Sequence, residues 1–132
     1  KDGLKLKKPL LEYYLKEDSL DDPIVSRDHL ELFGWATKKE IEKIDRMSLK
    51  INHCLINHFK KKGITLVDFK IEFGRLSSNK KKIVLADEIS PDSCRLWDSK
   101  SKTKLDKDVF RKGLGNLIDA YEEVASRLGI VH

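Results

Sequence analysis

Charged residues that alternate with apolar ones between Leu66 and Gly74 are the strongest candidates for chemistry in this sequence. Successive side chains of a strand point to opposite faces, so Asp68, Lys70 and Glu72 would share one face. The aromatic and aliphatic residues between them would form the other, apolar face. Carboxylates beside a lysine suit the binding of Mg²⁺ and phosphate groups, so the charged face indicates phosphoryl-transfer chemistry.

A β-hairpin is predicted to bring a further carboxylate, Asp87, to Glu72. The period of two predicts strands over residues 64–75 and 82–88, joined by a polar turn. If the turn is centred just after Asn79, Glu72 and Asp87 lie directly opposite each other. Opposed like charges destabilise a hairpin, so this pair requires a cation such as a lysine or Mg²⁺. The alternative is that both residues are ordinary solvent-facing positions, and a one-residue slip of the register would remove the pairing.

Two helices are predicted before this hairpin. Ser26 can cap a short helix that ends at Gly34, and the capping-box pattern over residues 37–40 opens a much longer helix that ends at Gly63. A strand is predicted still earlier, over residues 10–16. Along the long helix, apolar residues recur at steps of three and four and predict one buried stripe. This stripe consists of Ile41, Ile44, Met47, Ile51, Leu55 and Phe59.

Two further helices are predicted after the hairpin. A loop containing Pro91 leads to a short helix over residues 106–112, and Asn116 caps a last helix that stops at Gly129. Together the strands and helices predict an α+β fold, an antiparallel sheet with helices packed on one side. The apolar face of the last helix is formed by Leu117, Tyr121, Val124, Ala125 and Leu128.

The composition is that of a charged, basic chain with the size of one domain. Its 132 residues carry a formal net charge of +5, which suits anionic partners such as phosphorylated metabolites or nucleic acid. The two cysteines lack the spacing of a disulfide framework or a metal knuckle, which favours a reducing cytoplasm. No apolar run approaches the roughly 20 residues that span a bilayer, and the missing initiator methionine indicates an excerpt from a longer chain.

Several motifs together resemble the SAICAR synthases, the phosphoribosylaminoimidazole-succinocarboxamide synthases. The stretch Leu66–Gly74 is similar to the family's signature, and residues 87–98 resemble the block that follows it. Further matching stretches occur in the family's order and spacing, so the resemblance covers essentially the whole chain. These stretches are Pro9–Lys16, Asp22–Pro23, Phe33–Trp35, Leu105–Arg111 and Ala120–Ala125.

This resemblance implies a fold and an activity. Residues 1–132 would form the C-terminal catalytic lobe, with an ATP-grasp or kinase-like layout, and the N-terminal nucleotide-binding lobe would lie outside this sequence. The family joins L-aspartate to carboxyaminoimidazole ribonucleotide (CAIR) in de novo purine biosynthesis. ATP phosphorylates the CAIR carboxylate, and the aspartate amine then displaces phosphate to give SAICAR. Such a ligase would need ATP and Mg²⁺, and this portion alone is expected to be inactive.

The resemblance also implies roles for individual residues. Glu72 and Asp87 would hold Mg²⁺ against the ATP phosphates, and Lys16 would contact the nucleotide near its ribose. Asp68 and Lys70 would line the region where the substrate carboxylate is activated. These five residues form the implied ATP-binding and catalytic part of the site.

Further residues would contact the substrates. Arg95 would bind the ribonucleotide phosphate through its planar, permanently charged guanidinium, unless it forms only a surface ion pair. Asp22 would join the catalytic residues, while Asp92, Lys107 and Asp108 would bind substrate. Each of these last four is equally suited to capping a turn or a helix, so a structural role stays open for them.

The partners implied by the resemblance are small molecules: ATP, CAIR and L-aspartate. The resemblance also implies a homo-oligomer, a dimer, with neither nucleic acid nor a membrane as partner. Two other functions stay open on the residues alone. A basic nucleic-acid-binding module would explain the lysine clusters over residues 60–62 and 80–82. Another ATP- and Mg²⁺-dependent phosphoryl-transfer enzyme of kinase-like layout would explain the carboxylates.

Overall fold

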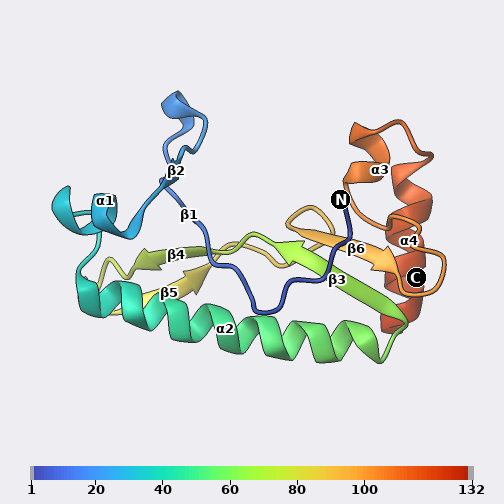
Figure 1. The fold of residues 1–132 in the computed structure, drawn as a ribbon, viewed down its shortest axis with the longest axis horizontal. Helices are drawn as coiled ribbons and strands as arrows, with labels where there is room; N and C mark the ends of the chain where they lie inside the picture. Colours follow the sequence, from blue (N-terminus) through green and yellow to red (C-terminus); the bar gives the residue numbers. More distant parts are fainter. Residues whose placement is uncertain (1, 131–132) are drawn as a thin grey trace. The chain divides into compact units, whose positions relative to one another are not determined.

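The computed structural model describes residues 2–130, and Figure 1 shows the order of its helices and strands. The chain forms two compact units, unit 1 (Lys1–Lys50) and unit 2 (Ile51–His132), with the boundary inside the long helix α2 (Lys38–Lys60). The described residues combine helices with three two-stranded antiparallel sheets, which confirms the α+β class. None of the helices in this part of the chain is long and apolar enough to cross a membrane.

Unit 1 contains a short β-ladder. The strand predicted over residues 10–16 is only Tyr13–Tyr14 (β1), which pairs antiparallel with β2. The partner strand is short because Pro23 before it has no N–H and Ser26 after it begins a helix. The connection between the strands, predicted as a loop, contains a short 3₁₀-helix. The remaining bounds are η1 Asp18–Leu20, β2 Ile24–Val25 and α1 Arg27–Leu32.

Both predicted helix starts are confirmed. The Ser26 hydroxyl accepts a hydrogen bond from the His29 backbone N–H at 3.1 Å, so Ser26 caps α1. At the start of α2, the Glu40 N–H donates to the Thr37 hydroxyl at 3.2 Å, and the Thr37 N–H donates to the Glu40 carboxylate at 3.0 Å. This reciprocal pair is the predicted capping box. The predicted apolar stripe of α2 is also confirmed, since all of its residues are buried or half-buried.

Asp45 on α2 binds two other elements of unit 1. Its carboxylate accepts hydrogen bonds from the Tyr13 hydroxyl of β1 and from the Arg27 guanidinium of α1, the latter at 2.5 Å. The guanidinium of Arg27 also lies 5.4 Å from the centroid of the Tyr13 ring. Burial and the hydrogen bond to Asp45 raise the pKa of the Tyr13 hydroxyl, so it stays a donor. These contacts fix β1, the strand that precedes Lys16.

Unit 2 contains two β-ladders and the helices α3 and α4. β3 pairs with β6 and β4 with β5, and Figure 1 shows each pair as neighbouring arrows. The single strand predicted over residues 64–75 is divided, because its two halves pair with different partners. The last two helices were predicted, whereas β6 falls where a loop was expected. The bounds are β3 Ile64–Phe69, β4 Glu72–Arg75, β5 Ile83–Ala86, β6 Cys94–Asp98, α3 Asp108–Arg111 and α4 Leu117–Leu128.

The hydrophobic core of unit 2 joins the first ladder to the helices. Ile64 of β3 and Leu96 of β6 are each 1% exposed. They belong to one cluster with Phe59, near the end of α2, and Val124 of α4. Burying an aliphatic side chain of this size stabilises a fold by roughly 1.5–3 kcal/mol. The cluster therefore holds β3 against β6 and α4 against both strands.

The predicted register of the β4–β5 hairpin is wrong by one residue. Glu72 lies opposite Ala86, one position before the carboxylate that was expected to face it. The turn is centred on Asn79 rather than after it: the Leu76 N–H donates to the Lys82 carbonyl at 3.1 Å, and the Lys82 N–H donates to the Asn79 carbonyl at 2.9 Å. Turn geometry fixes the register of a hairpin, so every cross-strand partner moves by one position.

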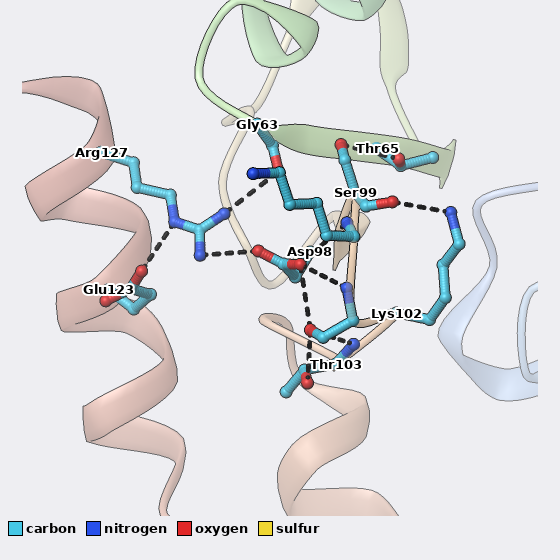
Figure 2. Close-up of polar contacts among 10 residues, drawn as sticks. Gly63, Thr65, Asp98, Ser99, Lys102, Thr103, Glu123 and Arg127 are labelled. Atoms are coloured by element: carbon cyan, nitrogen blue, oxygen red, sulfur yellow. Dashed lines mark hydrogen bonds and ion pairs between the residues drawn. The ribbon is translucent and has the colours of Figure 1, made fainter.

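Arg127 of α4 connects distant backbone segments of unit 2 (Figure 2). Its guanidinium donates to the Gly63 carbonyl at 3.1 Å and lies 2.8 Å from the Asp98 carboxylate at the end of β6. A further ion pair joins it to Glu123 at 2.7 Å. Hydrogen bonds from the Ser101 N–H and from Arg127 hold the pKa of Asp98 far below its usual range. Arg127 thus ties α4 to the residue before β3 and to the last residue of β6.

Replacing Arg127 with methionine should destabilise the protein at pH 7, because the Gly63 carbonyl and the Asp98 carboxylate both lose the guanidinium as a donor. The folded pKa of Asp98 is depressed, so its contribution is present above about pH 4 and lost as the pH falls through the folded pKa. The difference in urea unfolding between wild type and Arg127→Met should therefore shrink towards pH 2. Arg111→Met, at an exposed position of α3, is the control. An equal loss in the two variants would contradict the role of Arg127.

Candidate active site

A β-bulge at Val67 decides which side chains β3 and β6 present together. Leu66 lies opposite Leu96, yet Asp68 lies opposite Arg95, so Val67 is an extra residue on β3. In an unbroken strand, Asp68 would point to the same side as Leu66, towards the core. The extra residue turns Asp68 to the exposed side of the ladder, where Arg95 is its cross-strand partner.

Arg95 forms ion pairs with two carboxylates from different elements. Its Nη1 lies 3.1 Å from Asp68 Oδ2 of β3, and its Nε lies 3.4 Å from Asp108 Oδ2 of α3. Asp108 is also 3.8 Å from Lys112 Nζ. The side chains of Arg95 and Asp68 are 50% and 56% exposed, whereas that of Asp108 is 8% exposed. The fold thus brings three of the predicted site residues into one cluster, the Arg95 cluster (Asp68, Arg95 and Asp108).

Asp106, which the sequence did not single out, joins the backbones of β6 and α3. It is 1% exposed and accepts the Leu96 N–H at 2.7 Å and the Asp108 N–H at 2.8 Å. Desolvation raises the pKa of this carboxyl, although both hydrogen bonds oppose the shift. Leu96 follows Arg95 in the chain, and Asp108 is the ion-pair partner of Arg95. Asp106 therefore holds both sides of the Arg95–Asp108 contact in place.

Asp92 and Lys107 make contacts that fix the loop before β6. The Asp92 carboxylate accepts a hydrogen bond from the Tyr121 hydroxyl of α4, and the Asp92 N–H donates to the Ser90 hydroxyl at 3.1 Å. Burial and the hydrogen bond to Asp92 raise the pKa of Tyr121. The Lys107 N–H donates to the Pro91 carbonyl at 3.3 Å, just before α3. These contacts favour a structural role for Asp92 and for the Lys107 backbone.

Glu72 and Asp87 lie at the same end of the β4–β5 ladder. Glu72 is half-buried opposite Ala86, and Asp87 is exposed and directly follows Ala86. Asp87 has a left-handed backbone conformation, with φ 65°, and its carboxylate accepts the Glu88 N–H at 2.8 Å. The strand therefore ends before Asp87. The two carboxylates are neighbours at the strand ends without being a direct cross-strand pair.

Mg²⁺ at Glu72 and Asp87 would need ligands from outside the protein. Among the described residues, no three or more His, Cys, Asp or Glu side chains are gathered in a way that could hold a metal ion. Two carboxylates completed by phosphate oxygens and water match the way Mg²⁺ binds in nucleotide enzymes, so these residues fit the ion. Lys70, between β3 and β4, has an exposed side chain, and its N–H donates to the Ser93 carbonyl at 2.8 Å. Lys70 precedes Glu72 by two residues in the chain, and its positive charge suits the binding of a phosphate group.

The other two predicted residues, Lys16 and Asp22, belong to unit 1. Lys16 is exposed and lies two residues beyond the end of β1. Asp22 is half-buried with φ 47°, and its carboxylate accepts the Glu17 N–H at 2.8 Å. This hydrogen bond closes the loop between β1 and β2. It favours the structural role for Asp22 and leaves the side chain of Lys16 on the surface of unit 1.

Three residues of the site region were missed by the sequence-based prediction. The bulge at Val67 has no local signal, since nothing in the composition of β3 marks it. Asp106 precedes Asp108 by two residues, and an Asp side chain commonly accepts an N–H two positions further on, so this spacing was an available signal. Tyr121 was assigned to an apolar helix face, although a partly buried tyrosine hydroxyl requires a partner.

Comparison with known proteins gives one consistent result. A family model described as SAICAR synthetase matches residues 1–128. The phosphoribosylaminoimidazole-succinocarboxamide synthase of Pelagibacter ubique is 60% identical over 99% of this chain and 51% of its own length. The crystal structure of the synthase from Ehrlichia chaffeensis superposes with a TM-score of 0.96 at 50% identity, covering 100% of this chain and 56% of that one. A SAICAR synthetase solved in complex with ADP has a TM-score of 0.89 at 49% identity, covering 96% and 53%.

Replacing Asp106 with alanine should destabilise the protein by about 2–4 kcal/mol, because two buried N–H groups lose their acceptor. Asp106→Asn keeps one acceptor oxygen and should cost roughly half as much. Chemical denaturation monitored by circular dichroism would measure both losses. Asp119→Ala, at an exposed position of α4, serves as the control and should change stability by less than about 0.5 kcal/mol. Wild-type stability in the Asp106→Ala protein would show that the carboxylate does not hold β6 to α3.

Proposed function

The chain belongs to the SAICAR synthetase family, and from this membership we propose that it forms the C-terminal catalytic lobe of an ATP-dependent ligase. The ligase would join L-aspartate to CAIR and release SAICAR, ADP and phosphate, a step of de novo purine biosynthesis. The chain spans about half the length of the relatives it matches, 51% of the Pelagibacter ubique synthase. We therefore assign the activity to a larger protein, in which an N-terminal nucleotide-binding lobe completes the site.

The observation that carries this proposal is the placement of candidate residues on consecutive elements of unit 2. Only Lys70 and Ile71 separate β3 from β4, so Asp68, Lys70 and Glu72 lie within residues 68–72. Arg95 adds a cation opposite Asp68 on β6. Carboxylates for a metal ion and cations for phosphate groups are thus held on paired strands or directly beyond a strand end, where their positions are well defined. The SAICAR synthetase solved with ADP supports a nucleotide as one ligand of the family.

Each candidate side chain would act on a charge that the reaction creates or moves. A CAIR carboxylate oxygen attacks the γ-phosphorus of ATP, the bond to ADP breaks, and an acyl phosphate forms. The aspartate amine then attacks the acyl carbon, the C–N bond forms and phosphate leaves. Lys70 would stabilise negative charge on the transferring phosphoryl group, and Asp68 would accept the proton that the amine loses.

The remaining candidates would bind and orient the substrates. Glu72 and Asp87 would hold Mg²⁺ together with phosphate oxygens of ATP. When bound, this ion neutralises charge on the phosphates. Arg95 would bind the ribonucleotide phosphate through its guanidinium, and Lys16 of unit 1 would contact the nucleotide. The structure favours a structural role for three further residues, and any contact with substrate would be additional to that role. These residues are Asp92, Lys107 and Asp108.

We propose a cytoplasmic homodimer whose partners are the three small substrates. Among the described residues both cysteines are free, Cys54 exposed and Cys94 buried, as suits a reducing compartment. The net charge of +5 would favour the approach of the anionic substrates ATP and CAIR. Neither nucleic acid nor a membrane is part of the proposal.

An assay of ADP release by the full-length protein tests this function. ATP, CAIR and L-aspartate are supplied together and then omitted one at a time, and SAICAR is detected by chromatography. We expect ADP release to require both CAIR and L-aspartate. Release with a generic hydroxyl acceptor would instead support another phosphoryl-transfer enzyme. Tight oligonucleotide binding without ligase activity would support the nucleic-acid-binding module.

Removing either proposed metal ligand should abolish Mg²⁺-dependent activity. Glu72→Gln and Asp87→Asn in the full-length enzyme should each lower kcat by about 100-fold or more, because the carboxylate charge on the ion is lost. Circular dichroism should show an unchanged fold, and raising the Mg²⁺ concentration should restore part of the activity. Glu122→Gln and Asp119→Asn remove the same charges from exposed positions of α4 and should have little effect. Near-normal turnover with an unchanged Mg²⁺ requirement would count against the metal assignment.

A further inference from the structure

Arg95 has two carboxylate partners that differ greatly in exposure. Asp108, on Nε at 3.4 Å, is 8% exposed, whereas Asp68, on Nη1 at 3.1 Å, is 56% exposed. One cation thus lies between two anions, one of them in the protein interior and the other in solvent. Lys112 adds a second, longer contact to the buried carboxylate at 3.8 Å. Asp68 should therefore be easier to displace from Arg95 than Asp108.

The buried partner should stay and the exposed partner should exchange. A nearly buried carboxylate that loses its cation pays a large desolvation cost, so Asp108 keeps its contact with Arg95. An ion pair that is exposed to solvent contributes little to stability, because both groups are well hydrated when they separate. Asp68 can therefore leave Arg95 at small cost. A dianionic phosphate offers more charge and a geometry suited to two parallel N–H donors, so it is a stronger partner for the exposed edge of the guanidinium.

We propose that Asp68 is an internal competitor for phosphate at Arg95, so that the arrival of a phosphorylated substrate releases the Asp68 carboxylate for the reaction. The inference rests on the proposed function for the identity of that substrate, a ribonucleotide 5′-phosphate. Before binding, Arg95 neutralises Asp68. After binding, phosphate occupies Arg95, Asp108 still holds the Nε edge, and the Asp68 carboxylate is free to accept a proton.

The local geometry permits this exchange without movement of the backbone. Asp68 and Arg95 are direct partners in the β3–β6 register, and the strands themselves are held by backbone hydrogen bonds and by half-buried Leu66 opposite buried Leu96. Only rotation of the Asp68 side chain is required. Phosphate binding at Arg95 therefore determines whether the Asp68 carboxylate is paired with Arg95 or free to accept a proton.

Titration of the full-length protein with ribose 5-phosphate, with ribose as the control ligand, tests the proposal by calorimetry. Asp68→Asn should tighten ribose 5-phosphate binding by about 2- to 5-fold, the value of one exposed ion pair, and leave ribose binding unchanged. In the Arg95→Met background, the same substitution should have no effect. Glu122→Gln removes an equal charge at an exposed position of α4 and should not change the Kd.

A second readout separates competition from a merely structural role. In the ligase assay, Asp68→Asn should lower kcat and also lower the KM for the ribonucleotide. Asp68 is exposed, so the variant is expected to fold, which circular dichroism would verify. Weaker or unchanged ribose 5-phosphate binding by Asp68→Asn would overturn the proposal, as would an equal gain in the Arg95→Met background.

The titration needs neither ATP nor L-aspartate, so its failure is distinct from failure of the proposed function. If Asp68→Asn binds ribose 5-phosphate more tightly but the wild-type protein has no ligase activity, the competition between Asp68 and phosphate is supported and the proposed ligase function is refuted. If ADP release depends on L-aspartate but Asp68→Asn does not change the affinity for ribose 5-phosphate, the ligase function is supported and the competition between Asp68 and phosphate is refuted.

Discussion

The antiparallel pairing of β3 with β6, with its bulge at Val67, is the constraint on which the candidate site depends. Before the bulge, half-buried Leu66 lies opposite buried Leu96, and after it exposed Asp68 lies opposite Arg95. Without the extra residue, the carboxylate of Asp68 would point towards an apolar core, where an unpaired charge is strongly disfavoured. One inserted residue thus lets a single strand contribute both to the core and to the charged surface.

Around this ladder, the burial of the charged groups decreases from the core to the surface. Asp106 is fully buried and bound to backbone N–H groups of β6 and α3, so it belongs to the scaffold. Asp108 is nearly buried and binds side chains, while Asp68 and Arg95 are half exposed. Each charged group is therefore positioned by one that is more buried than itself. This order suits a site that must hold its shape and still exchange partners with a charged substrate.

Local features of the fold could be predicted from sequence, and long-range pairings could not. The caps at Ser26 and Thr37 and the stripe along α2 depend on residues within a few positions of each other. β6 was missed because its partner, β3, lies about 30 residues earlier and because Pro91 indicated a loop. The resemblance predicted Arg95 as a site residue, and only the fold shows that Asp68 and Asp108 are its ion-pair partners.

The error in the β4–β5 register changes the electrostatic argument for the metal ion. With Glu72 directly opposite Asp87, repulsion would have required a resident cation. Ala86 takes that opposing position instead, and the Asp87 carboxylate accepts a backbone N–H beyond the strand. The two carboxylates are thus neighbours at one end of the ladder without facing each other across it. The observed register therefore removes the electrostatic argument for a permanent cation. It agrees with our proposal that Mg²⁺ would bind here only together with phosphates of the nucleotide, which would supply the ligands that two carboxylates leave open.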